Sequence, residues 1–369
     1  MKKVLVTGAN GFIGGNLITA LNGNAEILKY DIENTLEELK AFVREADFIF
    51  HLAGVNRPLE VSEFNAGNKG FTELILEILK DNDLNTPVLM TSSTQAVLDN
   101  PYGQSKKDAE SLMFEYSAQT GAQVFVYRLP NVFGKWCRPN YNSVVATWCY
   151  NVSHGLPIQI NNPDTELNLV YIDDVIQEFI GALNGSASRI DTGFCFISRT
   201  FSTTLRQLAD MLNTFKESRN SLIMPSLEGD FERFLYATYL SYLAKDDFCY
   251  DLEMKEDQRG WLAEFFKSPS MGQIFISRTK PGITRGNHWH HTKVEKFLVI
   301  EGEAVIRFRQ ISGQEVIEYN VSGDRLQVLD IPPGYTHSIQ NVGNTDVLTL
   351  FWADEIFNQE RPDTFYLEV

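Results

Sequence analysis

Short apolar runs alternate with amphipathic stretches through the first half of the chain. The stretch 71–80 places its apolar residues on one helical face, and 103–116 is a second predicted helix. Strands that alternate with helices are typical of a parallel sheet with helical crossovers, so this half is predicted to be a doubly wound α/β fold. The predicted strands lie at 4–6, 25–30, 47–52, 88–91 and 124–129.

Beyond about residue 255 the pattern changes to brief alternating strands separated by Gly, Pro and Asp, which predicts an all-β barrel or sandwich. Before it, 232–243 is predicted to be helical and 244–251 to be a polar linker. We therefore expect two domains, at 1–245 and 246–369. The predicted strands of the second domain are 297–300, 305–309, 316–319, 326–331 and 348–352.

Composition narrows the class of protein. The 32 Lys and Arg residues against 48 Asp and Glu residues give a net charge of −16, which repels phosphate backbones and anionic membranes. We therefore expect no nucleic-acid partner. No run of about 20 apolar residues and no apolar leader occurs, so neither a membrane span nor a signal peptide is predicted. The 4 cysteines show no CxxC spacing, which favours reduced thiols and a cytoplasmic protein.

A glycine-rich turn follows the first predicted strand and opens a helix. Its glycines let the backbone turn tightly and approach a pyrophosphate, as in Rossmann-type dinucleotide-binding sheets. Asp31 closes the second strand about 20 residues later, where a carboxylate accepts hydrogen bonds from adenosine hydroxyls and favours NAD over NADP. A tight turn without a ligand is the alternative. The candidate residues in the turn are Gly8, Asn10, Gly11, Phe12, Ile13 and Gly14.

A phenol and an ammonium group lie four residues apart, at Tyr102 and Lys106, and so on one face of a helix. The cation is expected to lower the pKa of Tyr102 and let the phenol exchange a proton with a sugar oxygen. This spacing also occurs by chance in helices. However, Ser93 directly follows a predicted strand and supplies a hydroxyl in the order glycines, serine, tyrosine, lysine.

With three further segments, these patterns resemble the extended short-chain dehydrogenase/reductase family, whose members act on nucleotide sugars. The segments are 51–54 (His-Leu-Ala-Gly), 128–134 (Arg-Leu-Pro-Asn-Val-Phe-Gly) and 171–174 (Tyr-Ile-Asp-Asp). The resemblance covers about the first 240 residues.

The resemblance implies a role for each matching residue. Ser93 is expected to hold the substrate carbonyl, Tyr102 to deliver a proton, and Lys106 to bind the nicotinamide ribose. Leu52 and Ala53 fall in the cofactor-binding part of the family pattern. The resemblance also implies that Asn131 lines the sugar-nucleotide pocket and that Arg138 binds the diphosphate, although Arg138 also fits a solvated surface charge.

Four potential metal ligands gather in the second domain: His288, His290, Glu295 and His337. Histidines at i and i+2 of a strand point to the same face, and Glu295 can return beside them after a turn. Three imidazoles and a carboxylate suit Zn²⁺, Fe²⁺, Mn²⁺ or Ni²⁺. A structural or surface histidine cluster is the alternative.

This pattern resembles the cupin family, which implies a jelly-roll barrel and a divalent metal, and Zn²⁺ is the metal expected here. The segments 257–260 and 285–288 also resemble the deoxysugar 3,5-epimerase branch, which removes a proton beside a ketone. Lys296 is the residue expected to stabilise the resulting enolate. In those epimerases the residue at His288 is the base, which conflicts with its use as a ligand. Either His291 acts as the base or the metal is structural.

The fusion of both domains resembles the bifunctional enzymes of capsular polysaccharide synthesis on the UDP-N-acetyl-L-fucosamine route. That resemblance implies C3 epimerisation and NADPH-dependent C4 reduction of a UDP-hexulose, and a homodimer. One alternative is a 4,6-dehydratase or C4-epimerase with retained NAD, although Thr94 and Gln95 replace the Asp-Glu pair of dehydratases. The other is a non-catalytic dinucleotide sensor with a cupin domain for assembly.

Overall fold

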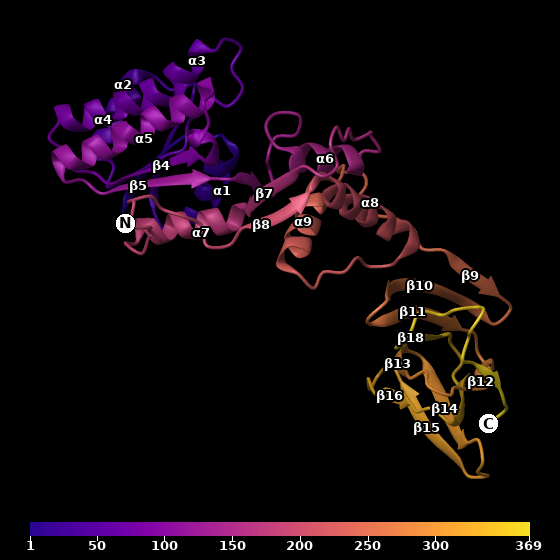
Figure 1. Ribbon diagram of the computed structural model, residues 1–369. Coiled ribbons are helices and arrows are strands. Elements are labelled where there is room, and N and C mark those ends of the chain that lie inside the picture. The colour runs from indigo at the N-terminus through magenta and orange to yellow at the C-terminus, as the bar shows by residue number, and fades with distance from the viewer. The chain divides into compact units, whose positions relative to one another are not determined.

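The computed structural model describes all residues from 1 to 369 and divides them into two compact units (Figure 1). The first contains 1–213 and 227–244, and the second contains 214–226 and 245–369. The grouping of 214–226 with the second unit was not predicted. It follows from backbone pairing, because Met224 donates to the Lys267 carbonyl at 2.8 Å and Lys267 donates to the Leu222 carbonyl at 2.8 Å. No helix is long and apolar enough to cross a membrane.

A five-stranded parallel sheet forms the centre of the first unit, in the order β2-β1-β3-β4-β5. The chain runs from β1 to β2 on one side and then crosses to β3 on the other side, which is the topology of a doubly wound sheet. This confirms the predicted α/β class. The strands are β1 (Lys3–Thr7), β2 (Glu26–Tyr30), β3 (Phe48–His51), β4 (Val88–Ser93) and β5 (Val124–Leu129).

Helices cover both faces of this sheet (Figure 1). On one face, buried residues of α2, α4 and α5 pack against alternate strand residues such as Leu5, Ile49 and Val126. On the other face, Phe50 of β3 stacks on Phe179 of α7, and α7 packs beside α1. These helices are α1 (Phe12–Leu21), α2 (Leu36–Glu45), α4 (Phe71–Asp81), α5 (Pro101–Thr120) and α7 (Ile172–Leu183).

Shorter elements complete the first unit. A three-stranded sheet contains β6 (Asn131–Phe133), β7 (Glu166–Tyr171) and β8 (Phe201–Thr204). The predicted helix at 232–243 is α9 (Asp230–Leu240). The remaining elements are α3 (Ser62–Phe64), the π-helix η1 (Asn65–Gly70), the 3₁₀-helix η2 (Thr94–Val97), α6 (Val144–Ser153) and α8 (Leu205–Ser221), whose last residues belong to the second unit.

The second unit consists of two antiparallel sheets, as expected for a cupin-type barrel. Their orders are β16-β13-β18-β11-β10-β9 and β15-β14-β17-β12-β19. The strands are β9 (Met254–Asp257), β10 (Gly260–Ser268), β11 (Gly272–Thr279), β12 (Thr284–Trp289), β13 (Glu295–Glu301), β14 (Glu303–Gln310), β15 (Val316–Ser322), β16 (Val328–Ile331), β17 (Tyr335–Asn341), β18 (Val347–Ala353) and β19 (Phe365–Tyr366).

Alternation along these strands places one face of each sheet inside the barrel. On β13, Phe297 and Val299 are buried while their neighbour Lys296 is exposed. Phe351 stacks on Phe275 at 4.8 Å and meets Phe297 edge-on at 4.5 Å. This aromatic layer lies next to Glu295 along β13, so it forms a rigid apolar base beneath the residues described below.

Candidate functional site

The loop between β1 and α1 has a backbone that requires glycine. Gly8 has φ +68°, and a Cβ there would lie 2.9 Å from the backbone of Ala53. A Cβ at Gly14 would lie 2.1 Å from the carbonyl oxygen of Gly8. The predicted loop residues therefore form one tight turn that presses against the segment after β3.

The first turn of α1 leaves its amides available. Its N-cap, Gly11, offers no side-chain hydrogen bond, and no acidic residue stands in the first turn. Unpaired amides and the positive end of the helix dipole together attract an anion. Phe12 and Ile13 contribute such amides, so this end of α1 can bind the diphosphate of a dinucleotide.

Asp31 lies beside the glycine loop at the carboxyl end of β2. Its Oδ2 accepts a hydrogen bond from the Asn10 amide at 2.7 Å, and its Oδ1 accepts one from the Ile32 amide at 2.8 Å. The carboxylate thus ties the second strand to the loop. Its position at the strand end is also the one from which an acidic residue binds adenosine hydroxyls.

Leu52 and Ala53 follow β3 directly, at the point where the strand order of the sheet reverses. The Ala53 amide donates to Thr7 Oγ1 at 3.2 Å, which joins the carboxyl ends of β1 and β3. Ligands of open α/β sheets bind outside the carboxyl ends at such a switch point. The structure therefore brings all the predicted cofactor residues of the loop, β2 and β3 to this edge.

The same edge carries Ser93, Tyr102 and Lys106. Ser93 ends β4, and α5 begins at Pro101 after the N-cap Asn100, whose side chain accepts from the Gly103 amide at 2.8 Å. Tyr102 is in the first turn of α5 and Lys106 one turn later, buried with its ammonium donating to the Thr91 carbonyl at 3.3 Å.

Burial dominates the electrostatics of this group. It lowers the pKa of Lys106 to about 8, and the negative charge of Glu110 opposes this shift. Burial raises the pKa of Tyr102, and a hydrogen bond with Ser93 opposes that increase. The expectation that Lys106 lowers the pKa of Tyr102 is therefore wrong for this arrangement, because the spacing predicted a shared helix face but not the degree of burial.

Two residues that the sequence did not single out act on this group, one through a hydrogen bond and the other through its charge. Asn56, in the loop after β3, accepts a hydrogen bond from the Tyr102 hydroxyl at 3.0 Å. Glu110, one turn after Lys106, accepts from Ser92 Oγ at 2.5 Å and from Nε of Arg128 at 2.8 Å. Glu110 shares the face of Tyr102 and Lys106 at the same four-residue spacing, which is a signal that could have found it.

The two predicted substrate residues lie beyond this edge, in the segment that begins at β6. Asn131 is the exposed first residue of β6. Arg138 is also exposed, and its guanidinium lies 5.6 Å from the ring centroid of Tyr141. Trp136, between them, has φ 70°, which is rare for a bulky residue. Their roles in substrate binding stay predictions.

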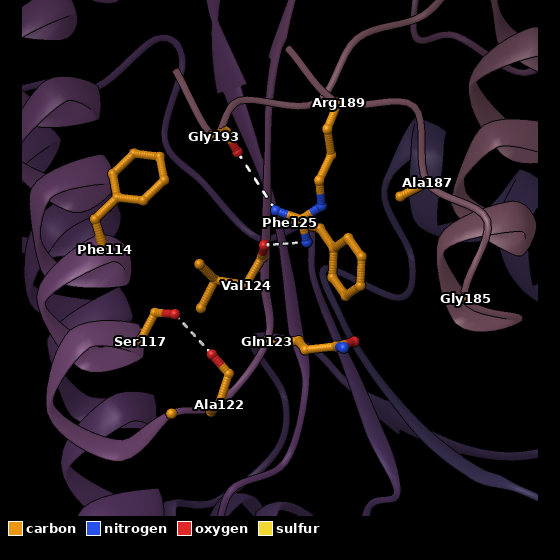
Figure 2. Close-up of a pocket in the computed structure, with 11 residues that line it drawn as sticks. Phe114, Ser117, Ala122, Gln123, Val124, Phe125, Gly185, Ala187, Arg189 and Gly193 are labelled. Atoms are coloured by element: carbon orange, nitrogen blue, oxygen red, sulfur yellow. Dashed lines mark hydrogen bonds between the residues drawn. The ribbon is translucent and has the colours of Figure 1, made fainter. Parts of the chain in front are cut away.

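A cavity of about 650 Å³ lies at the opposite, amino end of β5 (Figure 2). None of the predicted site residues lines it. Its one charged side chain, Arg189, donates to the carbonyl oxygens of Val124 at 2.8 Å and Gly193 at 3.5 Å, and stacks over Phe125. This cavity is therefore not a candidate for the catalytic site.

In the second unit, the four predicted metal ligands converge. One nitrogen or oxygen atom from each of them lies within 4.8 Å of those of the others. A β-bulge between Gly286 and His288, with Asn287 at φ 60°, sets His288 directly opposite His337 of β17. Such a bulge changes the direction of the following side chains. His290 lies just beyond β12 and Glu295 is the first residue of β13.

The residues of this cluster fit a divalent cation. Glu295 Oε2 lies 3.2 Å from Nε2 of His290 and 3.3 Å from Nε2 of His337. His337 is fully buried; its Nδ1 has no hydrogen-bond partner, and its Nε2 makes no well-aligned hydrogen bond although Glu295 Oε2 lies near it. Burial, and secondarily the neighbouring His337, lowers the pKa of His288 to about 4, so its ring is neutral and has a free lone pair. Buried polar atoms without partners are costly, and a cation would satisfy them.

Lys296 does not belong to this cluster, which corrects its predicted role. It follows Glu295 on β13, so its side chain lies on the opposite face of the sheet. There it forms an exposed ion pair with Asp330 of the neighbouring β16. The ring of His291 packs against Trp289 and Phe365 instead of pointing to the other three histidines.

Known proteins are similar to this chain over its whole length. It is 43% identical over 369 residues to a UDP-2-acetamido-2,6-beta-L-arabino-hexul-4-ose reductase of Pseudomonas aeruginosa, covering 100% of this chain and 99% of the relative. The crystal structure of the capsular polysaccharide assembling protein CapF from Staphylococcus aureus has 48% identity and a TM-score of 0.93, covering 99% of this chain and 100% of that one. A UDP-N-acetylglucosamine 4-epimerase of Methanobrevibacter ruminantium has 19% identity, covers 65% of this chain and 98% of its own, and shares the fold with a TM-score of 0.55.

The family matches agree with the two units. Residues 255–365 match the polysaccharide biosynthesis C-terminal domain, and residues 4–190 match the NAD dependent epimerase/dehydratase family. The second match contains the glycine loop, the end of β2 and the Ser93, Tyr102 and Lys106 group. The chain is therefore an enzyme that belongs to the NAD dependent epimerase/dehydratase family and carries a polysaccharide biosynthesis C-terminal domain.

Proposed function

We propose that this enzyme converts a UDP-2-acetamido-2,6-dideoxy-4-hexulose to UDP-2-acetamido-2,6-dideoxy-L-talose for surface polysaccharide synthesis. The barrel epimerises C3, and the first unit then reduces the C4 ketone. The observation that carries the proposal is the full-length similarity to a hexul-4-ose reductase in a chain that holds both residue groups described above. A soluble cytoplasmic homodimer is part of the same proposal.

In the reduction, Ser93 hydrogen-bonds to the C4 carbonyl oxygen and holds it beside Tyr102. A reduced nicotinamide held at this edge of the sheet would supply the hydride for C4. The phenol of Tyr102 then gives its proton to the new alkoxide, and Lys106 holds the nicotinamide ribose and stabilises the phenolate that remains. Since burial raises the pKa of Tyr102, the phenol is protonated at neutral pH and ready to act as the acid.

The phosphorylation state of the coenzyme is a separate question. The family resemblance implies NADPH. The end of β2 instead presents two carboxylates, Asp31 and Glu33, on either side of the exposed Ile32. A 2′-phosphate on the adenosine ribose would lie against these negative charges, whereas a 2′-hydroxyl can donate to Asp31. The local chemistry thus favours NADH, and steady-state rates with each coenzyme decide between them.

In the epimerisation, a base takes the proton from C3 beside the C4 ketone, and a proton is then returned to C3 on the opposite face. His288, His290, Glu295 and His337 are the residues that would hold a divalent cation, and their nitrogen-rich donor set suits Zn²⁺ among the candidates. Such a cation supplies a Lewis acid for the negative charge that develops on the ketone oxygen. The aromatic layer of Phe275, Phe297 and Phe351 excludes water beneath the cluster.

The proposal is tested by incubating the purified full-length enzyme with the UDP-4-hexulose in D₂O, with and without NADH or NADPH. Without coenzyme, NMR is expected to show deuterium at C3. With coenzyme, the C4 alcohol forms with one equivalent of coenzyme oxidised. If a sugar product forms without net oxidation of the coenzyme, the enzyme is instead an epimerase that retains its NAD. If no deuterium enters C3, the proposed role of the barrel is refuted.

A further inference from the structure

The C-terminal segment of the chain closes over the strand that carries the metal-ligand histidines. β19 pairs antiparallel with the end of β12, opposite His288 and Trp289. Next to it, the Leu367 amide donates to the Asn287 carbonyl at 3.0 Å. The residues that follow the barrel strands are thus bonded to the bulge that directs His288, although about 80 residues separate them in the sequence.

One residue of this segment, Asp363, organises the loop between β12 and β13. Its carboxylate accepts hydrogen bonds from the amides of His291 at 3.0 Å, Thr292 at 2.9 Å and Lys293 at 2.9 Å, and from the Thr292 hydroxyl at 3.1 Å. The Lys293 ammonium is buried and donates to the Pro362 carbonyl at 2.6 Å. Hydrogen bonds therefore fix the loop between His290 and Glu295 to Asp363 and its neighbour Pro362.

The backbone carbonyl of Asp363 contacts a metal-ligand histidine directly. It lies 2.6 Å from Nδ1 of His290 and accepts the proton of that nitrogen. A neutral imidazole has a single N–H, so this bond leaves the lone pair on Nε2, the nitrogen that faces Glu295. Asp363 has φ 38°, an uncommon conformation for a residue other than glycine, and its carboxylate hydrogen bonds hold it there.

We infer that Asp363 is a positioning residue of the metal cluster. Its carboxylate fixes the backbone of 291–293, and its carbonyl fixes the tautomer and ring orientation of His290. The inference rests on the metal binding proposed above, but Asp363 itself is not among the converging ligands. Hydrogen-bonded partners of metal-ligand histidines typically change metal affinity by 10–100-fold when they are lost.

The test compares the metal affinity of full-length variants. Wild type, Asp363→Ala and Asp363→Asn are stripped with a chelator and titrated with Zn²⁺ against a chromogenic competitor. Asp363→Ala is expected to bind Zn²⁺ about 10–100-fold more weakly. Asp363→Asn keeps the side-chain shape and one acceptor oxygen, so a smaller loss is expected. Asp330→Asn is the matched control, because that carboxylate lies on the outer face of the same barrel and bonds only to Lys296 in an exposed ion pair.

A second readout separates positioning from general stability. The d–d absorption of bound Co²⁺ reports ligand geometry, and we expect it to change in Asp363→Ala while the dinucleotide affinity of the first unit stays the same. If both variants keep the Zn²⁺ affinity and the Co²⁺ spectrum of the wild type, the role of Asp363 is refuted, while the proposed metal binding stands. Wild-type enzyme that takes up no metal overturns the metal proposal itself. If Asp363→Ala does not fold, the Zn²⁺ affinity of Asp363→Asn decides: a weaker affinity than wild type supports the inference, and an equal affinity refutes it.

Discussion

Neutralising Glu110 tests the buried network behind Tyr102 and Lys106. The Glu110 side chain is 3% exposed, and its carboxylate accepts two hydrogen bonds from Arg128, at 2.8 and 2.6 Å, and one from Ser92. These bonds join α5 to the ends of β4 and β5. Because Ser92 precedes Ser93, the network also sets where α5 meets the strand edge. The perturbation is Glu110→Gln.

The magnitude follows from the burial of the pair. Removing one partner of a fully buried ion pair costs about 3–5 kcal/mol. Arg128 keeps 31% of its side chain exposed and Gln retains the shape of Glu, so we expect about 2–3 kcal/mol of lost stability. For a unit of this size, that corresponds to a fall in melting temperature of about 4–12 °C. Glu37→Gln, which removes only an exposed ion pair with Lys40, is the control and is expected to leave the melting temperature unchanged.

We expect the same substitution to change the pH dependence of the proposed reduction. Burial lowers the pKa of Lys106 to about 8, and the charge of Glu110 opposes that shift. Lys106 is cationic below its pKa, so the reductase rate is expected to fall as the pH rises past about 8. Without the charge of Glu110 the pKa falls further, so this alkaline decline moves to lower pH. Thermal melts and rate–pH profiles measure both effects; unchanged stability, or an alkaline decline that stays in place or moves to higher pH, would refute the reasoning.

Three further substitutions test individual placements. Gly14→Ala is expected to abolish dinucleotide binding, measured by calorimetry, because its Cβ would lie 2.1 Å from the Gly8 carbonyl oxygen. Gly15→Ala is the control and is expected to keep binding, because a Cβ there has nothing within 4 Å. Equal affinities of the two variants would contradict the loop geometry. Asp31→Asn is expected to raise the ratio of kcat/KM for NADPH to that for NADH by about tenfold, since one charged hydrogen bond is worth about that factor, and an unchanged ratio contradicts its role. Lys296→Met is expected to leave deuterium exchange at C3 unchanged, because Lys296 lies on the outer face of the barrel; loss of exchange contradicts that placement.

Local sequence signals predicted much of the fold. The apolar runs and the glycine loop are encoded by residues that are adjacent in the sequence. The observed bounds of β1 to β5 and the start of α1 therefore lie close to the predicted ones. The boundary region is different. Residues 222–224 join the second unit through backbone bonds to Lys267, and nothing in the local pattern of 214–226 encodes that pairing.

The candidate sites divide in the same way. His288, His290, Glu295 and His337 were predicted as a group because their residue types are rare and suited to metals, and they do converge. The predicted role of Lys296 at the cluster was wrong, because adjacent residues of a strand point to opposite faces of the sheet. Asp363 could not be found from the sequence, since its partners are 70–73 residues away and its carbonyl contact with His290 depends on backbone geometry alone.

We propose that reduction and epimerisation use different residues of one chain, and the variant Tyr102→Phe can separate the two reactions. The variant is incubated with the UDP-4-hexulose and coenzyme in D₂O, and coenzyme oxidation and deuterium at C3 are followed together. We expect oxidation to fall by about 10²-fold or more, since the acid is gone, while deuterium enters C3 at the wild-type rate. Loss of C3 exchange together with oxidation would show that both reactions depend on Tyr102, and would contradict separate sites.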